Sequence, residues 1–194
     1  MNTMSSSKQG NTDRGTVLII EDEPDITRAY TRWLSADYEV RVAHTGGEAL
    51  DHLDDSVSIV LLDRRLPDIS GEQLLPQIRS SIDDCRVAII STAEPDFEIL
   101  EYGFDLYVEK PITEPATLRE AVRTLERRAT FDSKMQEFLS FASKKAMLET
   151  SKPQEELEQH DEYALLLERI ESLRADLDDV TVELDDEDLR VSFS

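Results

Sequence analysis

The 194-residue sequence contains one cysteine, Cys85, one tryptophan and only six glycines. A single cysteine excludes an internal disulfide and is compatible with a reducing compartment. No apolar run approaches the roughly 20 residues that a helix needs to cross a bilayer. The polar stretch 1–14 lacks the apolar segment of a signal peptide, so we expect a disordered lead-in there. Together these absences favour a cytoplasmic protein that does not span a membrane.

Basic residues are also scarce, at 21 against 43 acidic residues, and the formal net charge is −22. Such a charge repels the phosphate backbone of nucleic acids, and it keeps a protein soluble when salt screens other interactions. Only six of the basic residues are lysines. This composition is typical of a halophilic protein from a high-salt cytoplasm; the alternative is an acidic protein from an ordinary one.

Between Thr16 and Arg128, short apolar runs alternate five times with segments of helical periodicity. The run "VSIVLLD" is continuously apolar, as in a strand that is buried on both faces. The other expected strands are "TVLII", "YEVRVA", "CRVAIIST" and "DLYVEKP". Strands that alternate with helices in this rhythm indicate βαβ units. We therefore predict an α/β domain over residues 15–128, a doubly wound five-stranded parallel sheet.

The expected strands end in polar and charged residues that are able to bind ligands or react, namely Glu21, Asp22, Asp63, Ser91, Thr92 and Lys110. In parallel sheets ligands bind outside the carboxyl ends of the strands. Crowded carboxylates either raise a pKa or hold a cation, and hard oxygen ligands suit Mg²⁺. A carboxylate beside Mg²⁺ can attack a phosphoryl group, whose oxygens Thr92 and Lys110 would then neutralise.

These residues also allow other interpretations. Taken alone, Asp63 is also compatible with a helix cap or a solvated turn residue. A phosphatase of the haloacid dehalogenase type would need a second aspartate two residues after Asp63, and Arg65 stands there. A P-loop is excluded because no glycine-rich loop ends in Lys-Ser or Lys-Thr.

Four segments, "LIIEDEPD", "LLDRRLPDISG", "IISTAEPD" and "YVEKP", occur in this order, each at an expected strand end. With them the chain resembles the receiver domain of two-component response regulators, which has a flavodoxin-like fold. The resemblance implies that Asp63 is the phosphoacceptor and also binds Mg²⁺, with a sensor histidine kinase as partner. It implies that Asp22 binds Mg²⁺ directly, Glu21 through water and Arg65 through its backbone carbonyl. It further implies that Thr92 and Lys110 contact the phosphoryl group and that Tyr107 is the switch aromatic.

Two features depart from the receiver pattern. The chain between Thr92 and Lys110 is several residues short, so we expect a truncated fourth helix. Arg65 and Glu94 stand at the two positions that, by the resemblance to receiver domains, flank the route of the hydrolytic water. We expect their long, oppositely charged side chains to meet and act as a water gate.

Beyond Phe131 the sequence has no glycine and reads as helical. "FLSFASKKAMLE" resembles the HalX domain, and we expect a helical output module over residues 129–184 and an acidic tail over 185–194. Apolar residues recur in steps of three and four, forming a seam of Tyr163, Leu166, Ile170, Leu173, Leu177, Val180 and Leu184. Such a seam fits a hairpin of two helices or an intermolecular coiled coil about equally well, and both hold if hairpins pair.

We therefore expect a response regulator of a two-component phosphorelay that signals through its helical module, by protein partners or as a homodimer. The alternative is a phosphorylation-controlled DNA-binding transcription regulator. Acids outnumber bases after Phe131 and no helix-turn-helix signature is evident, which argues against direct contact with DNA. Apart from Mg²⁺-dependent self-phosphorylation and self-dephosphorylation, no enzymatic activity is expected.

Overall fold

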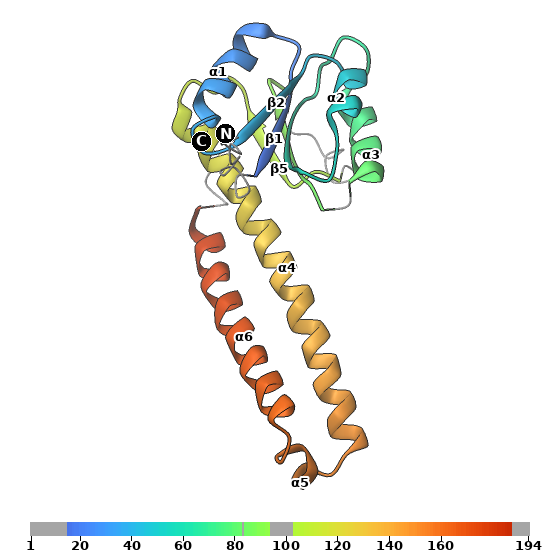
Figure 1. Cartoon of the computed structure of the whole chain (residues 1–194). Helices are drawn as coiled ribbons and strands as arrows, with labels where there is room; N and C mark the ends of the chain where they lie inside the picture. Colours follow the sequence, from blue (N-terminus) through green and yellow to red (C-terminus); the bar gives the residue numbers. More distant parts are fainter. Residues whose placement is uncertain (1–14, 83, 94–102, 188–194) are drawn as a thin grey trace, which may run out of the picture. The chain divides into compact units, whose positions relative to one another are not determined.

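The computed structural model describes residues 15–82, 84–93 and 103–187, and side chains as far as residue 179. The chain divides into two compact units, Met1–Phe104 and Asp105–Ser194. One five-stranded sheet has the order β2-β1-β3-β4-β5 (Figure 1). Its strands are β1 (Thr16–Ile20), β2 (Glu39–Ala43), β3 (Val57–Asp63), β4 (Arg86–Ser91) and β5 (Leu106–Glu109). The predicted doubly wound parallel sheet is confirmed.

Among the described residues of the first unit, three helices accompany the strands: α1 (Pro24–Leu34), α2 (Gly46–His52) and α3 (Gly71–Ser81). The hydroxyl of Thr45 caps α2 by accepting a hydrogen bond from the Glu48 N–H at 3.1 Å. Ser70 caps α3 in the same way, with the Gln73 N–H at 3.3 Å. Side chains that accept from the free N–H groups of the first turn fix where a helix begins.

The core of this unit is the central strand pair. All five residues of β1 are buried, and so are six of the seven in β3. The parallel register pairs Ile20 with Leu62, so both strands end at the same level. Because apolar side chains cover both faces of these strands, the residues that follow them emerge from a rigid base.

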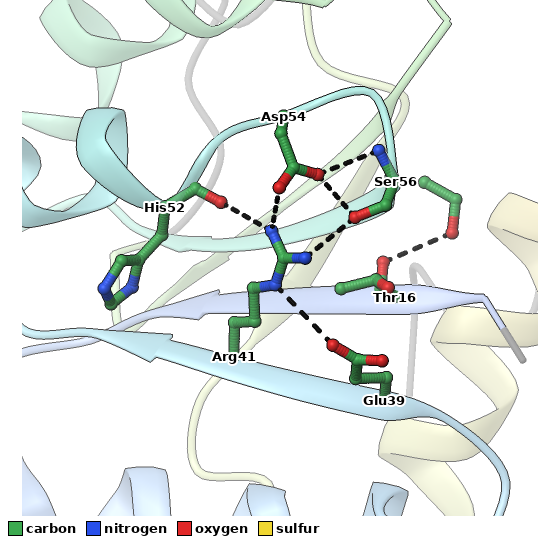
Figure 2. A network of polar contacts seen from close by, with 7 residues as sticks. Thr16, Glu39, Arg41, His52, Asp54 and Ser56 are labelled. Carbon is green, nitrogen blue, oxygen red and sulfur yellow. Dashed lines mark hydrogen bonds and ion pairs between the residues drawn. The ribbon is translucent and has the colours of Figure 1, made fainter. Parts of the chain in front are cut away.

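Arg41, on β2, joins this strand to the segment between α2 and β3 (Figure 2). Its guanidinium donates to the Asp54 carboxylate at 2.8 Å, to the Ser56 hydroxyl at 2.8 Å and to the His52 carbonyl at 3.0 Å. Glu39 lies 3.8 Å from the same group. This arrangement uses several of the five guanidinium donors and ties the edge strand to its neighbouring loop.

The second unit contains β5 and the helices α4 (Pro115–Ser151), α5 (Gln154–Leu157) and α6 (Asp161–Glu187). Helix α4 runs without interruption through 128 and 129, where the sequence predicted the boundary between receiver and output module. No glycine or proline occurs between Pro115 and Pro153, so nothing in that segment terminates a helix.

Helices α4 and α6 pack against each other in antiparallel directions (Figure 1). Lys134 pairs with Asp176 at 2.9 Å, and Arg169 pairs with Glu137 at 2.8 Å. Nearer to α5, the Tyr163 hydroxyl donates to Glu149 at 2.9 Å. These three pairs connect successive levels of the two helices.

The predicted seam of α6 lies in this helix pair. Tyr163, Leu173 and Leu177 are buried, and Leu166 and Ile170 are half-buried. The hairpin alternative for the seam is therefore confirmed within one chain. Val180 and Leu184 lie beyond the described side chains. Among the residues that the structure describes, no helix combines the length and apolar character that crossing a bilayer requires.

Candidate functional site

Three carboxylates meet beyond the ends of β1 and β3. Glu21, Asp22 and Asp63 each offer one oxygen, and these three oxygens lie within 4.8 Å of one another. Glu21 and Asp63 are only 2% and 8% exposed, whereas Asp22 is open to solvent. Partly buried like charges at this spacing repel strongly unless a cation or protons offset them. The donor set of hard oxygens with one exposed side fits Mg²⁺.

Backbone groups hold the two buried carboxylates. The Arg65 N–H donates to Oδ1 of Asp63 at 2.9 Å, and the Glu23 N–H donates to Oε1 of Glu21 at 3.3 Å. The Glu21 N–H donates in turn to the carbonyl of Ala43 at 3.0 Å, which ties it to β2. Each acid is therefore oriented by a main-chain N–H two residues further along its own chain segment.

The loop from Arg64 to Ser70 is closed on itself and anchored to α2. Arg65 and Ser70 form an antiparallel bridge at its two ends. Asp68 accepts hydrogen bonds from the N–H groups of Gly46 at 2.9 Å and Gly47 at 3.0 Å. These donors, that of Gly46 first, hold the pKa of the Asp68 carboxyl below its usual value. The anchor keeps the Arg65 main chain beside Asp63.

On the neighbouring strand, Ser91 is the last residue of β4, and its hydroxyl accepts from the Ala93 N–H at 3.1 Å. Thr92 follows directly and is exposed. Since Ile90 pairs with Asp63 in the register of β3 and β4, Thr92 stands beyond the same edge of the sheet as the three carboxylates.

The remaining predicted residues are in other parts of the chain. Tyr107 lies within β5 and Lys110 directly follows that strand; both are half-buried and belong to the second unit. The peptide bond between Lys110 and Pro111 is cis. Glu94, and with it the predicted truncated helix, lies outside the described residues.

Three contributors to this edge were not predicted from the sequence. Asp68 and the ion pair between Arg64 and Glu72, at 2.5 Å, shape the loop after Asp63. His44 follows β2, and its Nδ1 lies 2.9 Å from the Glu21 carbonyl. The sequence signal for site residues was a polar residue directly after an expected strand. His44, which directly follows β2, meets this criterion and could have been found in the same way.

Comparisons with known proteins match both parts of the chain. Residues 17–123 match the response regulator receiver domain, and residues 127–193 match the HalX domain. A candidate transcriptional regulator of Haloferax volcanii is 38% identical over 161 residues, which cover 82% of this chain and 27% of that protein. The transcriptional regulatory protein CpxR of Escherichia coli K12 is 28% identical over 123 residues, covering 62% of this chain and 53% of CpxR.

Among solved structures, a CheY-like receiver domain protein from Methanospirillum hungatei is similar with a TM-score of 0.53 and 25% identity. The match covers 59% of this chain and 95% of that one. The chain spans less than two thirds of the length of both curated relatives described above.

Proposed function

Because the chain belongs to the response regulator receiver domain family and ends in a HalX domain, we propose that it accepts a phosphoryl group on Asp63 and signals through its C-terminal helices. The family match confirms the resemblance inferred from the four sequence segments. The observation that carries the assignment to Asp63 is its position among three converging carboxylates, 8% exposed at the end of a buried strand.

In this proposal Glu21, Asp22, Asp63 and the backbone carbonyl of Arg65 hold Mg²⁺. Three carboxylate oxygens within 4.8 Å of one another support this assignment. A bound Mg²⁺ would offset the charge of these acids and of the incoming phosphoryl oxygens. The Asp68 anchor contributes by holding the Arg65 main chain in its loop.

The chemical step is an in-line displacement at phosphorus. One oxygen of the Asp63 carboxylate attacks, and a new O–P bond forms while the bond to the donor's leaving atom breaks. The leaving atom, a histidine nitrogen when a sensor kinase is the donor, departs with that electron pair. The Arg65 N–H, at 2.9 Å from Oδ1, keeps the carboxylate oriented for this attack.

Three further side chains have proposed roles around the phosphoryl group. The Thr92 hydroxyl donates a hydrogen bond to one phosphoryl oxygen, and the Lys110 ammonium neutralises another. Tyr107 is the aromatic residue whose rotamer reports the phosphorylated state. The exposed position of Thr92 next to the sheet edge supports its part of this proposal.

The proposed phosphodonor in the cell is a sensor histidine kinase, and the proposed location is the cytoplasm. Output passes through the helical module, either to a protein partner or by dimerisation. The antiparallel hairpin of α4 and α6 supports this role because it is a packed element of its own, with buried apolar residues.

The test is phosphorylation of the full chain by acetyl phosphate in the presence of Mg²⁺. We expect an acid-stable, base-labile adduct of one phosphoryl group, visible as a mass shift. Asp63→Asn should abolish it, because an amide is a poor nucleophile. Asp25→Asn, an exposed aspartate on α1 outside the carboxylate cluster, is the matched control and should keep the adduct. A full-strength adduct in the Asp63→Asn variant would refute the assignment.

The second candidate is a DNA-binding transcription regulator, which the names of both curated relatives favour. The charge of the module opposes direct contact with DNA, since α6 carries eleven acidic residues and two arginines. A DNA-reading surface normally carries a basic stripe. An electrophoretic shift of genomic DNA fragments that requires an intact Asp63 would favour this candidate over output through protein contacts.

A further inference from the structure

A groove of about 570 Å³ lies along the α4–α6 hairpin, near its α5 end. Its apolar lining comes from both helices and consists of Phe141, Met147, Leu148, Leu165 and Leu166. Met147 is 70% exposed and Leu165 is 63% exposed. These two side chains are therefore open to solvent.

Large exposed apolar side chains that gather in one groove mark an interaction site, whereas scattered ones do not. The contrast is strong here because the chain carries a net charge of −22. The seam of α6 cannot serve as this surface, since Tyr163, Leu173 and Leu177 are already buried within the chain. The groove is therefore distinct from the buried part of the seam, and it shares only the half-buried Leu166 with the seam residues whose side chains the structure describes.

Three charged side chains, Lys144, Glu162 and Arg169, also line the groove. Lys144 lines it from α4, with its ammonium 5.0 Å from the centre of the Phe141 ring. Glu162 and Arg169 line it from α6, and Glu137 of the same chain offsets the charge of Arg169 at 2.8 Å. Among the described residues, Lys144 forms no ion pair, whereas its neighbour Lys145 pairs with Glu149 at 2.9 Å. A cation at one rim and an anion at the other make the groove complementary to itself.

We propose that a second copy of this chain docks in the groove, with α4 of one copy against α6 of the other. A twofold axis parallel to the hairpin produces this arrangement and sets each Lys144 opposite the side of the groove that carries Glu162 in the other copy. Met147 and Leu165 of each copy then fill the other copy's groove, as in a four-helix bundle. The proposal rests on the proposed function only in that dimerisation is one of its two output routes.

The charges of whole helices favour the same orientation. Residues 129–151 of α4 carry three lysines and three acids, whereas α6 carries eleven acids and two arginines. Packing α6 on α6 would bring two strongly acidic surfaces together. Packing α4 on α6 sets a neutral surface against each acidic one, which avoids that repulsion.

The groove also sets the expected strength of the dimer. A standard interface uses about 20–30 residues on each side. Eight residues line this groove, including its charged rim. We therefore expect a weak dimer whose population depends on protein concentration.

Sedimentation equilibrium of the full chain at fixed high salt tests the proposal. The wild type should show a reversible monomer–dimer equilibrium, and Leu165→Asp or Met147→Asp should raise its Kd by at least about tenfold. Leu139→Asp is the matched control, because Leu139 is 56% exposed on α4 but does not line the groove. Circular dichroism of each variant checks that the helices are intact. We expect them to be, because the substituted side chains are exposed.

Exchanging the charges of Lys144 and Glu162 distinguishes a loss of docking from a loss of the folded structure. Lys144→Glu and Glu162→Lys should each weaken the dimer at moderate salt, and the double variant should recover it. A wild type that stays monomeric, groove variants that dimerise like the wild type, or a double variant without recovery would each overturn the proposal. The proposal would also be overturned if the chain were monomeric and its groove bound an acidic helix of another protein.

Sedimentation equilibrium is repeated with the Asp63→Asn variant, and with the wild type in Mg²⁺ plus acetyl phosphate. These measurements distinguish a failure of the docking proposal from a failure of the phosphoacceptor assignment. A chain that is phosphorylated on Asp63 but never dimerises refutes the docking proposal alone. A chain that dimerises through the groove but takes no phosphoryl group at Asp63 refutes the phosphoacceptor assignment alone.

Discussion

Gly71 begins α3 where the loop after Asp63 ends. A Cβ atom at this position would lie 2.7 Å from the Asp63 carbonyl oxygen and 2.9 Å from the Cα of Arg64. Both atoms belong to the backbone, so neither can move aside as a flexible side chain would. The Gly71 N–H also donates to the Arg64 carbonyl at 2.9 Å. The close approach of these two backbone segments requires glycine.

Gly71→Ala should therefore lower the free energy of unfolding by about 1–3 kcal/mol, the usual cost of forcing an extra methyl group into a packed site. It should also slow phosphorylation, because the strain falls on the segment that orients Asp63. Gly103→Ala is the control, since a Cβ atom there meets nothing within 4 Å. Urea unfolding of both variants checks this, and equal stabilities would contradict the steric argument.

From the sequence we predict that Arg65 and Glu94 act as a water gate for phosphorylated Asp63. If their side chains meet over the phosphoryl group, they hinder in-line attack by water and prolong the phosphorylated state. The Arg65→Ala/Glu94→Ala variant should then lose phosphate faster, and a barrier change of about 1.4 kcal/mol would make the rate tenfold higher. Loss of phosphate is followed at fixed Mg²⁺ and salt. Equal rates, or a slower variant, would show that the pair does not guard the site.

At the scale of elements, the contacts of Arg41 link β2 to the chain that enters β3 (Figure 2). Asp54 is the acid of this network, and its pKa is lowered from 3.8 to about 2. The hydroxyl of Ser56 is the largest cause, followed by the Ser56 N–H and the guanidinium of Arg41. All three donate to the carboxylate and so favour its charged form.

A depressed pKa gives a stabilising contribution that is complete above the unfolded value, 3.8, and is lost as the pH falls through about 2. The difference in the free energy of unfolding between wild type and Asp54→Asn should therefore be constant near neutral pH and shrink below about pH 4. Urea unfolding across this range measures it. Asp55→Asn, an exposed neighbour outside the network, should show no such trend; a difference that grows in acid would contradict the assignment.

The α4–α6 hairpin depends on the buried part of its seam. Leu173 is 1% exposed, so Leu173→Ala should lower the free energy of unfolding of the helical unit by about 2–5 kcal/mol. Leu167→Ala is the control on the same helix, because Leu167 is 38% exposed. Thermal unfolding followed by circular dichroism compares the two, and similar losses would show that the seam is not the main contact.

This packing also changes how a seam variant should be interpreted. The heptad pattern alone suggests Ile170→Asp with Leu177→Asp as a test of dimers. Leu177 is 7% exposed within its own chain. The double substitution would therefore disrupt the hairpin itself, and monomers of that variant would not report on contacts between copies. The exposed groove residues are the better positions for that test.

At the scale of the whole molecule, the dominant feature is the net charge of −22. Repulsion among exposed acids acts over about 30 Å at 0.01 M salt and about 3 Å at 1 M. We therefore expect the melting temperature to rise with salt over this interval, equally in KCl and NaCl, if screening is the cause. A melting temperature that stays constant over the interval would show that charge repulsion does not limit stability.

The order of the helices and strands, and the edge of the sheet that carries the acidic site, could both be predicted from the sequence. Periodicity distinguishes strands from helices, and the carboxyl ends of parallel strands meet at one edge of a sheet. That rule is enough to predict that Glu21, Asp22 and Asp63 come together, and the three carboxylates do converge in the folded chain.

Which surfaces face each other could be learned only from the folded chain. A heptad seam specifies one apolar side of a helix but not its partner, and packing showed that α6 covers α4 of its own chain. Asp68 reaches glycines about twenty positions earlier, a contact that no local pattern encodes. The groove formed by Met147 and Leu165 likewise exists only once the two helices lie side by side, because each contributes a single wall.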